Sequence, residues 1–304
     1  MHATVLKYFV EVARCGSIRK AAQNLFVASS AVNRQILKLE QELGTELFDR
    51  LPNGTRLNAA GQRVLQHVRA TLHDFHLVRT ELDAIKGERT GHISIVSMDS
   101  LFVDFLPVAI EQFSELYPAV TYAMFAKPPN EVPECVASGE FDIGICFANK
   151  LTPNVDLVAS VAMPPGVLMP PSHPLAGQAA ISYADCSRYA FLTSGGISPL
   201  ASVASDGFST FWDSLSSRIT CNSATMIKRM IISGQGIAIL SKIAFMAELE
   251  SGDVVWRPLA APEINQLRTG IIVSKHRQLP FVAQQFIDIQ VRRLKQLEAL
   301  AERF

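Results

Sequence analysis

The chain has 304 residues, of which 48% are hydrophobic and 18% charged, with a formal net charge of zero and 17 glycines and 16 prolines spread along it. This composition excludes a disordered, collagen-like or low-complexity protein, and the length favours more than one domain. No apolar run approaches the roughly 20 residues of a membrane helix, and the first residues lack a signal-peptide pattern, so we expect a cytoplasmic protein without a membrane partner.

The zero net charge hides an asymmetry between the two ends of the chain. Residues 1–90 contain 13 Lys and Arg against 9 Asp and Glu, whereas the remainder contains 15 against 19. A small basic head on a mildly acidic body predicts that a polyanion would bind the head. Solvated surface charge alone explains the same asymmetry about as well.

The head begins with three segments of helical periodicity, at residues 3–15, 18–25 and 29–43. Gly16 and Gly44 are suited to end the first and third helices, Ser17 to cap the second, and Ser29 or Ser30 to cap the third. The second helix is short and rich in alanine, which lets a neighbouring helix approach closely. A short helix joined tightly to a longer one is typical of helix-turn-helix units.

The third helix presents a short polar face opposite its apolar stripe. Its side chains have the chemistry that reads a major groove, since Asn and Arg pair with base edges while Ser and Lys bind bases or phosphates. The candidates are Ser29, Ser30, Asn33, Arg34 and Lys38. An ordinary solvated helix face is the alternative.

A two-stranded wing is predicted next, because Asn53-Gly54 is a strong hairpin-turn signal. Arg50, Asn53 and Arg56 surround this turn and are candidate contacts to phosphates or to a minor groove. Surface ion pairs with Glu46 or Asp49 are the alternative role of the two arginines.

A long helix is predicted from a cap at Asn58 to about Lys86. Its apolar residues recur at heptad-like spacing, which exceeds what a small head buries and predicts pairing with another helix. The candidate dimerisation residues are Val64, Val68, Leu72, Phe75 and Leu82. The alternative is a helix that lies on the chain's own body. Gly87 and Gly91 then indicate a hinge.

From Gly91 onward, strand-like runs alternate with helical stretches, and this rhythm predicts two α/β subdomains. The predicted strands are 92–97, 120–126, 142–147, 166–169, 190–193, 218–221, 236–240, 254–257 and 270–274, with helices near 101–117, 130–138 and 224–233.

The order of these features closely resembles the LysR-type transcriptional regulators over the whole chain, most specifically over its first 60 residues. The residues that carry the resemblance are Phe9, Gly16, Ser17, Ala21, Ala22, Leu25, Ala31, Val32, Arg34, Gln35, Ile36, Leu39, Glu40, Leu43, Gly44, Leu47, Phe48, Arg50, Leu57 and Gly61. The softer later landmarks are 138–143, 172–176 and 233–237.

The resemblance implies an α/β protein with a winged helix-turn-helix at 1–58, a dimerisation helix and hinge at 59–90, and a two-lobed, periplasmic-binding-protein-like effector domain at 91–304. On that template, lobe one is 91–162 with 267–304 and lobe two is 163–266. It further implies a homodimer or homotetramer that binds an interrupted inverted repeat in double-stranded DNA, responds to a small-molecule effector, recruits RNA polymerase and lies on the nucleoid when bound to DNA. No other cofactor and no metal are implied.

The chain departs from the family at three base-reading positions. It has Ala28-Ser29-Ser30 where the family usually has Thr-Gln-Pro or Ser-Gln-Ser, Asn33 where Ser is common, and Asn53 where a second wing Arg is common. The operator of a relative is therefore not carried over to this chain.

Ligands of open α/β sheets bind beyond the carboxyl ends of strands, near helix N-termini. Four segments of the body meet this description, and the effector-binding candidates in them are Ser97, Ser100, Phe147, Thr193, Ser194, Asn222, Ser223 and Thr225. Helix capping is an equally good role for each hydroxyl. Asp99 would repel an anion if it faced the cleft, which favours a small polar or weakly anionic effector.

Other function classes have weaker support. No histidine has a cysteine or acid at metal-ligand or catalytic spacing, so no catalytic residue is assigned and surface positions are preferred over a metal site for His73 and His76. The five cysteines contain no CxxC pair, and a structural role is preferred over redox regulation for Cys186 and Cys221. The alternative function is a cytoplasmic metabolite-binding module without a transcriptional role.

Overall fold

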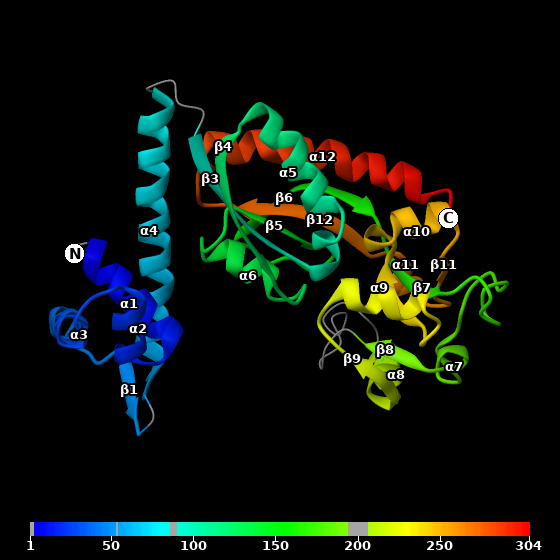
Figure 1. Cartoon of the computed structure of the whole chain (residues 1–304), viewed down its shortest axis with the longest axis horizontal. Helices are drawn as coiled ribbons and strands as arrows, with labels where there is room; N and C mark the ends of the chain where they lie inside the picture. Colours follow the sequence, from blue (N-terminus) through cyan, green and yellow to red (C-terminus); the bar gives the residue numbers. More distant parts are fainter. Residues whose placement is uncertain (1–2, 53, 86–89, 194–205) are drawn as a thin grey trace. The chain divides into compact units, whose positions relative to one another are not determined.

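A computed structural model describes residues 3–52, 54–85, 90–193 and 206–304 (Figure 1). The chain divides into two compact units, Met1–Leu82 with Ser138–Glu140 and Asp83–Ala137 with Phe141–Phe304. In the part of the chain that the model describes, no helix combines the length and the apolar character needed to span a bilayer.

The first unit is a helical head with a hairpin and a long helix. Its elements are α1 (Ala3–Cys15), α2 (Ile18–Asn24), α3 (Ser29–Leu43), β1 (Phe48–Leu51), β2 (Gly54–Leu57) and α4 (Ala59–Ile85). The predicted cap of α2 is confirmed, because the Ser17 side chain accepts a hydrogen bond from the Lys20 N–H. The predicted end of α3 is also confirmed, because Gly44 adopts the left-handed conformation with φ of 67°.

One apolar cluster holds the head together. Phe9 of α1 is fully buried and packs edge-on against Phe48 of β1, with ring centroids 5.4 Å apart. The small Ala21 and Ala22 bring α2 close, as their size predicts, and both are buried. The other buried members are Leu6, Val12, Val32, Ile36, Leu39, Leu47 and Val68.

The capping role predicted for Ser29 or Ser30 is wrong. Ala28 occupies the N-cap of α3, and no side chain caps that helix. The reason lies in the preceding turn, where the Val27 N–H bonds to the Ala22 carbonyl at 3.0 Å and the chain enters α3 at once. Ser29 and Ser30 are therefore exposed residues of the first helical turn.

The wing forms as predicted, but its turn is placed differently. Gly54 pairs with Leu51 as a strand residue, so it is not a turn residue. Its role is close packing: the Gly16 carbonyl accepts a hydrogen bond from the Thr55 N–H at 2.8 Å, and a Cβ on Gly54 would collide with that carbonyl oxygen. Asn53, predicted in the turn, lies outside the described residues.

Helix α4 starts as predicted, since the Asn58 carboxamide oxygen accepts a hydrogen bond from the Gly61 N–H at 2.8 Å. The predicted dimerisation stripe needs correction in its first half. Val68 is fully buried in the head cluster, whereas Val64 and Leu72 are half-buried and pack against that cluster, so the head covers Val68 completely and the other two in part.

The second half of the stripe is exposed. The exposed fractions are 66% for Phe75, 52% for Val78 and 53% for Leu82. These three residues recur at spacings of three and four, which places them on one face of α4. The pairing prediction therefore rests on this part of the helix.

The second unit contains a mixed five-stranded sheet with the order β4-β3-β5-β12-β6. Its strands are β3 (Thr90–Ser97), β4 (Ala119–Ala126), β5 (Ile143–Phe147), β6 (Val155–Ala162) and β12 (Arg268–Ser274). β3 is parallel to β4 and β5, whereas β12 is antiparallel to β5 and β6. Apart from Thr90, the first residue of β3, all five strands fall in the range predicted for lobe one.

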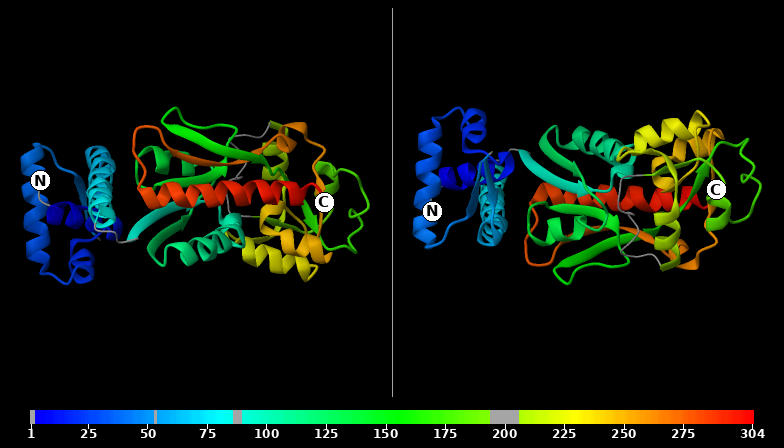
Figure 2. Two further views of the ribbon diagram at one scale, coloured as in Figure 1. Left: turned by 90° about the horizontal axis from the view of Figure 1, so that it is seen from above. Right: turned by 90° about the horizontal axis from the view of Figure 1, so that it is seen from below.

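Three helices cover this sheet: α5 (Phe105–Leu116), α6 (Val132–Ala137) and α12 (Phe281–Ala301). α5 and α12 lie side by side, with Phe113 edge-on to Phe286 at 5.1 Å, and α6 lies on the opposite side of the sheet (Figure 1). α12 runs along the sheet and ends beside the second lobe (Figure 2).

The range predicted for lobe two holds two smaller sheets. One is antiparallel with the order β10-β7-β11 and the other is the parallel pair β8-β9. The strands are β7 (Pro165–Met169), β8 (Phe191–Thr193), β9 (Ser217–Thr220), β10 (Ala238–Ser241) and β11 (Val255–Pro258). The helices are α7 (Tyr183–Cys186), α8 (Asp206–Ser214), α9 (Ala224–Ile232), α10 (Met246–Ser251) and α11 (Pro262–Asn265), and short 3-10 turns are η1 (Asp99–Phe102) in lobe one and η2 (Lys242–Ala244) in lobe two.

Candidate nucleic-acid interface and effector site

The outward face of α3 is exposed and cationic. Ser29, Ser30, Arg34 and Lys38 are exposed, and Asn33 is half-buried beside them. Among the described residues Arg34 makes no ion pair, while Lys38 pairs loosely with Glu42 at 4.0 Å on the surface. All five predicted residues of this helix therefore share one accessible face.

The N-terminus of α3 adds to this face. Because Ala28 provides no side-chain cap, the first N–H groups of the helix are not satisfied by a side chain. Uncapped N–H groups and the positive end of the helix dipole favour a phosphate at this position. A serine at the N-cap would have accepted a hydrogen bond from one of these N–H groups.

The wing contributes two further cations. Arg50 is exposed, and Arg56 lies opposite Asp49 in the hairpin, 3.6 Å from its carboxylate. The ion pair with Asp49, one of the alternatives weighed from the sequence, is thus present. An exposed pair of this kind contributes little stability, so Arg56 exchanges it for a phosphate at low cost.

Two carboxylates to which the sequence analysis assigned no role hold elements of the head in position. Glu40 of α3 accepts a hydrogen bond from the Leu47 N–H at 2.7 Å and so positions the start of the wing. Glu11 of α1 accepts from the Arg14 guanidinium at 2.6 Å and from the Asn24 amide at 2.8 Å, which ties α1 to the end of α2.

The hydrogen bonds to Glu11 lower the pKa of its carboxyl group. The bond from Arg14, followed by those from Asn24 and the Cys15 thiol, lowers the pKa of Glu11 from 4.5 to about 2, against the opposing effect of burial. Glu11 is therefore a carboxylate throughout the physiological range. The signal that could have found it is the carboxylate three residues before Arg14 at a helix end.

In the body, the predicted effector hydroxyls are largely used within the fold. Ser97 is fully buried and donates to the Met98 carbonyl at 3.3 Å. Thr193 is buried, with its hydroxyl 3.0 Å from that of Thr220. Ser223 accepts from the Met226 N–H and caps α9. The capping alternative is thus present for Ser223.

The remaining candidates lie at the ends of the same elements. Ser100 is half-buried in η1, and Phe147 packs against the hydrophobic clusters of both lobes. Asn222 and Thr225 are exposed on either side of the α9 cap. Ser194 lies outside the described residues.

Asp99 brings two of these segments together. Its carboxylate accepts a hydrogen bond from the Ala224 N–H, the first residue of α9. The segment that follows β3 in lobe one is thereby joined to the start of α9 in lobe two. Just before α9, the Cys221 N–H donates a hydrogen bond to the Thr193 carbonyl at 3.0 Å, within lobe two. Asp99 occupies the position at which a helix N-terminus would otherwise receive an anion.

Further along α9, Lys228 makes a second connection between the lobes. Its ammonium lies 2.7 Å from Glu248 of α10 and 3.6 Å from Asp104, just before α5, and the side chain is 12% exposed. Lys242 of η2 makes a third, donating to the Ala301 carbonyl at the end of α12 at 2.8 Å. Sequence reasoning missed these contacts because their partners are far apart in the chain.

Two of the residues considered for other functions, Cys186 and His173, take structural roles. The Cys186 thiol is fully buried, and burial raises its pKa to about 12, which keeps it protonated and shielded from oxidants. His173 packs edge-on against Tyr189, and its ring nitrogen accepts from the Leu175 N–H. The described residues contain no group of three metal-ligating side chains, and the side chains of His73 and His76 lie outside them.

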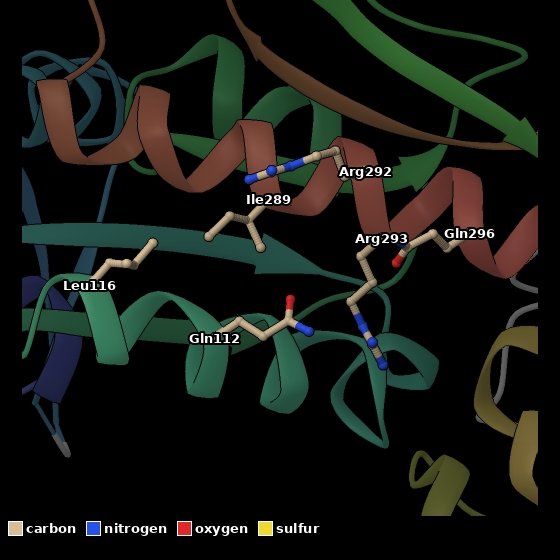
Figure 3. Close-up of a pocket in the computed structure, with 6 residues that line it drawn as sticks. All are labelled: Gln112, Leu116, Ile289, Arg292, Arg293 and Gln296. Atoms are coloured by element: carbon tan, nitrogen blue, oxygen red, sulfur yellow. The ribbon is translucent and has the colours of Figure 1, made fainter.

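One surface pocket of about 260 Å³ lies elsewhere, between α5 and α12 (Figure 3). It is lined by Gln112, Leu116, Ile289, Arg292, Arg293 and Gln296. None of the effector candidates lines it.

Two family models match the chain. Residues 4–62 match the bacterial regulatory helix-turn-helix protein model of the lysR family, and residues 86–295 match the LysR substrate binding domain. The second match alone covers more than half of the chain.

Known proteins match over nearly the whole length. A probable nitrogen assimilation transcriptional activator from Synechococcus elongatus is 25% identical over 283 residues, covering 92% of this chain and 91% of that protein. The transcriptional dual regulator GltC of Bacillus subtilis is 27% identical over 305 residues, covering 98% and 99%.

Among solved structures, CbnR, a LysR family transcriptional regulator, matches with a TM-score of 0.62 and 21% identity over 97% of this chain and 99% of its own. CbnR in complex with its target DNA matches with a TM-score of 0.59 and 19% identity over 96% and 100%. At this identity the match shows a shared fold.

Proposed function

Because the chain belongs to the LysR family of transcriptional regulators, we propose that its winged head binds an interrupted inverted repeat in double-stranded DNA and that a small-molecule effector at the lobe junction sets its activity. The chain is a DNA-binding regulator with an effector-binding domain. Its known relatives are transcriptional regulators, which are not enzymes.

The observation that carries the DNA-binding proposal is the exposed, uncapped and cationic face of α3 next to a basic wing. With α3 in a major groove, Arg34 reaches a guanine edge and Asn33 an adenine edge, while Ser29 and Ser30 bind a base or phosphate beside the helix N-terminus. Lys38 binds the backbone on the flank. Arg50 and Arg56 extend the contact to the neighbouring phosphates or minor groove.

The effector proposal rests on the convergence of Asp99 with the first turn of α9. The Asp99 carboxylate already fills that helix N-terminus, which opposes a simple carboxylate effector at the same N–H group. We therefore favour a small polar effector that binds beside Ser100, Asn222 and Thr225 and replaces or reinforces the Asp99 contact. Such a ligand shifts the equilibrium between lobe arrangements only as far as its affinities for them differ.

The assembly proposed is a homodimer or homotetramer that sets two heads on successive major grooves. A change in lobe arrangement then alters the spacing of the heads, the bending of the DNA and the recruitment of RNA polymerase. This scheme places the protein in the cytoplasm, on the nucleoid when it is bound to DNA.

The test is retention of sheared genomic DNA by the purified full-length protein at moderate salt, followed by sequencing, with Arg34→Ala as the matched control. Enrichment of a shared interrupted palindrome by the wild type and not by the variant supports the proposal. If neither enriches a sequence and a metabolite screen finds tight binding without DNA, the protein acts as a metabolite-binding module instead.

A further inference from the structure

One residue of the head combines two unusual properties. Phe26, in the turn between α2 and α3, is 94% exposed, more than any other large apolar side chain in the described parts of the chain. Its φ of 55° is also the only positive value of a non-glycine residue there.

The fold gives no reason for a phenylalanine at this position. The turn is closed by backbone groups alone, since the Phe26 N–H donates to the Gln23 carbonyl at 3.2 Å. A left-handed residue at a helix C-terminus is met with least strain by glycine or asparagine, whereas a side chain with a bulky Cβ substituent is strained there. The ring also gains no burial in the fold, because it is almost completely exposed to water.

The position of Phe26 indicates what covers it. Only two residues separate it from Ser29, so its Cα lies within roughly 10 Å of the first residue of α3. Ala28, Ser29 and Ser30 are all exposed, and they continue the accessible surface from Phe26 onto the face of α3 that reads DNA. The exposed ring therefore lies within a few residues of the proposed nucleic-acid interface.

We propose that the Phe26 ring is a DNA contact, packed on an apolar part of the operator next to the bases read by α3. The apolar groups that DNA offers at this place are the thymine C5 methyl and the faces of the deoxyribose ring. The contact adds affinity without neutralising a phosphate. This inference rests on the proposed DNA-binding function.

The test uses full-length protein and a duplex that the wild type selects from a random-sequence pool. Dissociation constants are measured by fluorescence anisotropy for Phe26→Gly, Phe26→Asn and, as a control at an exposed apolar residue of the second unit, Leu116→Asn. We expect both Phe26 variants to bind about 5- to 20-fold more weakly, within the range of single apolar or base contacts. The control should bind like the wild type.

Two further readouts separate this role from a structural one. The slope of log K against log salt stays unchanged in the Phe26 variants, since no counterion release is lost. Their head is at least as stable as that of the wild type, because Gly and Asn relieve the left-handed strain, and amide hydrogen exchange of α2 and α3 checks this. Replacing thymines by deoxyuridine weakens wild-type binding if the ring contacts a methyl group and leaves it unchanged if the ring contacts a sugar.

Unchanged dissociation constants in the Phe26 variants would overturn the inference while leaving DNA binding intact. A loss of affinity that follows a loss of dimer mass in sedimentation equilibrium would also overturn it, because Phe26 would then contact a second copy of the chain. Failure of the wild type to select a duplex would instead reject the proposed function.

Discussion

Arg34 and Lys38 lie one helical turn apart on α3, yet their environments predict different consequences for DNA binding. Arg34 is exposed and, among the described residues, forms no ion pair, whereas Lys38 sits on the flank near Glu42. A planar guanidinium donates two parallel hydrogen bonds to a guanine, while an ammonium binds a phosphate as a point charge.

Arg34→Ala is expected to weaken binding to the selected operator by about 1 to 3 kcal/mol and to leave non-specific binding nearly unchanged. Lys38→Ala is expected to weaken both kinds of binding equally and to lower the salt slope by about 1. Anisotropy titrations over a range of salt, with operator and scrambled duplexes, measure both effects. If Arg34→Ala loses the same affinity for both duplexes, Arg34 contacts the DNA backbone and does not read a base.

The lowered pKa of Glu11 predicts that the stability of the head depends on pH. Its pKa falls from 4.5 to about 2 on folding, chiefly through the hydrogen bond from Arg14. Since the folded pKa is the lower one, the carboxylate stabilises the head above about pH 4.5, and this contribution is lost as the pH falls from there towards 2. Arg14 is 66% exposed, so solvent screening reduces the effect to about 1 kcal/mol.

Glu11→Gln should therefore speed amide hydrogen exchange in α1 and α2 several-fold at neutral pH, and the difference from the wild type should shrink below pH 4. Glu42→Gln, at an exposed surface pair, is the matched control and should have no such effect. A difference between wild type and Glu11→Gln that stays constant with pH would show that the amide substitution acts through packing instead.

At the scale of elements, helix α9 is bound to lobe one at two points. Asp99 accepts from the Ala224 N–H at its start, and Lys228 one turn later faces Asp104 as well as Glu248. Asp99→Asn keeps the acceptor atom but removes the charge that the helix N-terminus favours, a loss of about 0.5 to 1 kcal/mol.

We expect Asp99→Asn to raise amide exchange in the first turn of α9 by roughly two- to fivefold without unfolding the body. Asp185→Asn is a suitable control, because Asp185 forms the capping box of α7 with Ser182, within lobe two. Should exchange in α9 stay at the wild-type rate, the Asp99 contact does not hold the lobes together.

The elements that the sequence predicted best are those whose signals lie within a few residues. Ser17, Gly44 and Asn58 act on helix ends two to four residues away, and all three act as predicted. Strand β6 was missed, although it has eight residues, because its support comes from pairing with β12 more than a hundred residues later. The Asp99 and Lys228 contacts escaped prediction for the same reason.

The candidate sites divide in the same way. The face of α3 was predictable because helical periodicity alone decides which side chains point outward. The role of Val68 was not, because an apolar stripe has the same spacing whether it packs on its own head or on a second copy. Phe26 carried no sequence signal at all, since its left-handed backbone and its exposure are both properties of the folded turn.

For the whole molecule, we expect α4 to decide whether two heads act together in the proposed dimer. In its first half Val68 is buried by the head, whereas Phe75, Val78 and Leu82 in its second half are more than half exposed on one face. An exposed apolar stripe of this kind favours association, and two linked heads bind two half-sites far more tightly than one head binds one.

If the chain forms the proposed dimer through α4, replacing both Phe75 and Leu82 by Glu should convert it to a monomer in sedimentation equilibrium, because buried charges would face each other across the helix pair. Affinity for a duplex with both half-sites should then fall at least 100-fold, while affinity for a single half-site should change little. Leu116→Glu, at another exposed apolar residue, should leave the mass and both affinities unchanged. Val68→Ala should instead loosen the head, with faster exchange in α1 and α3, because Val68 is a core residue. A dimer that survives the Phe75 and Leu82 substitutions would mean that the copies associate through another surface and that α4 covers its stripe in some other way.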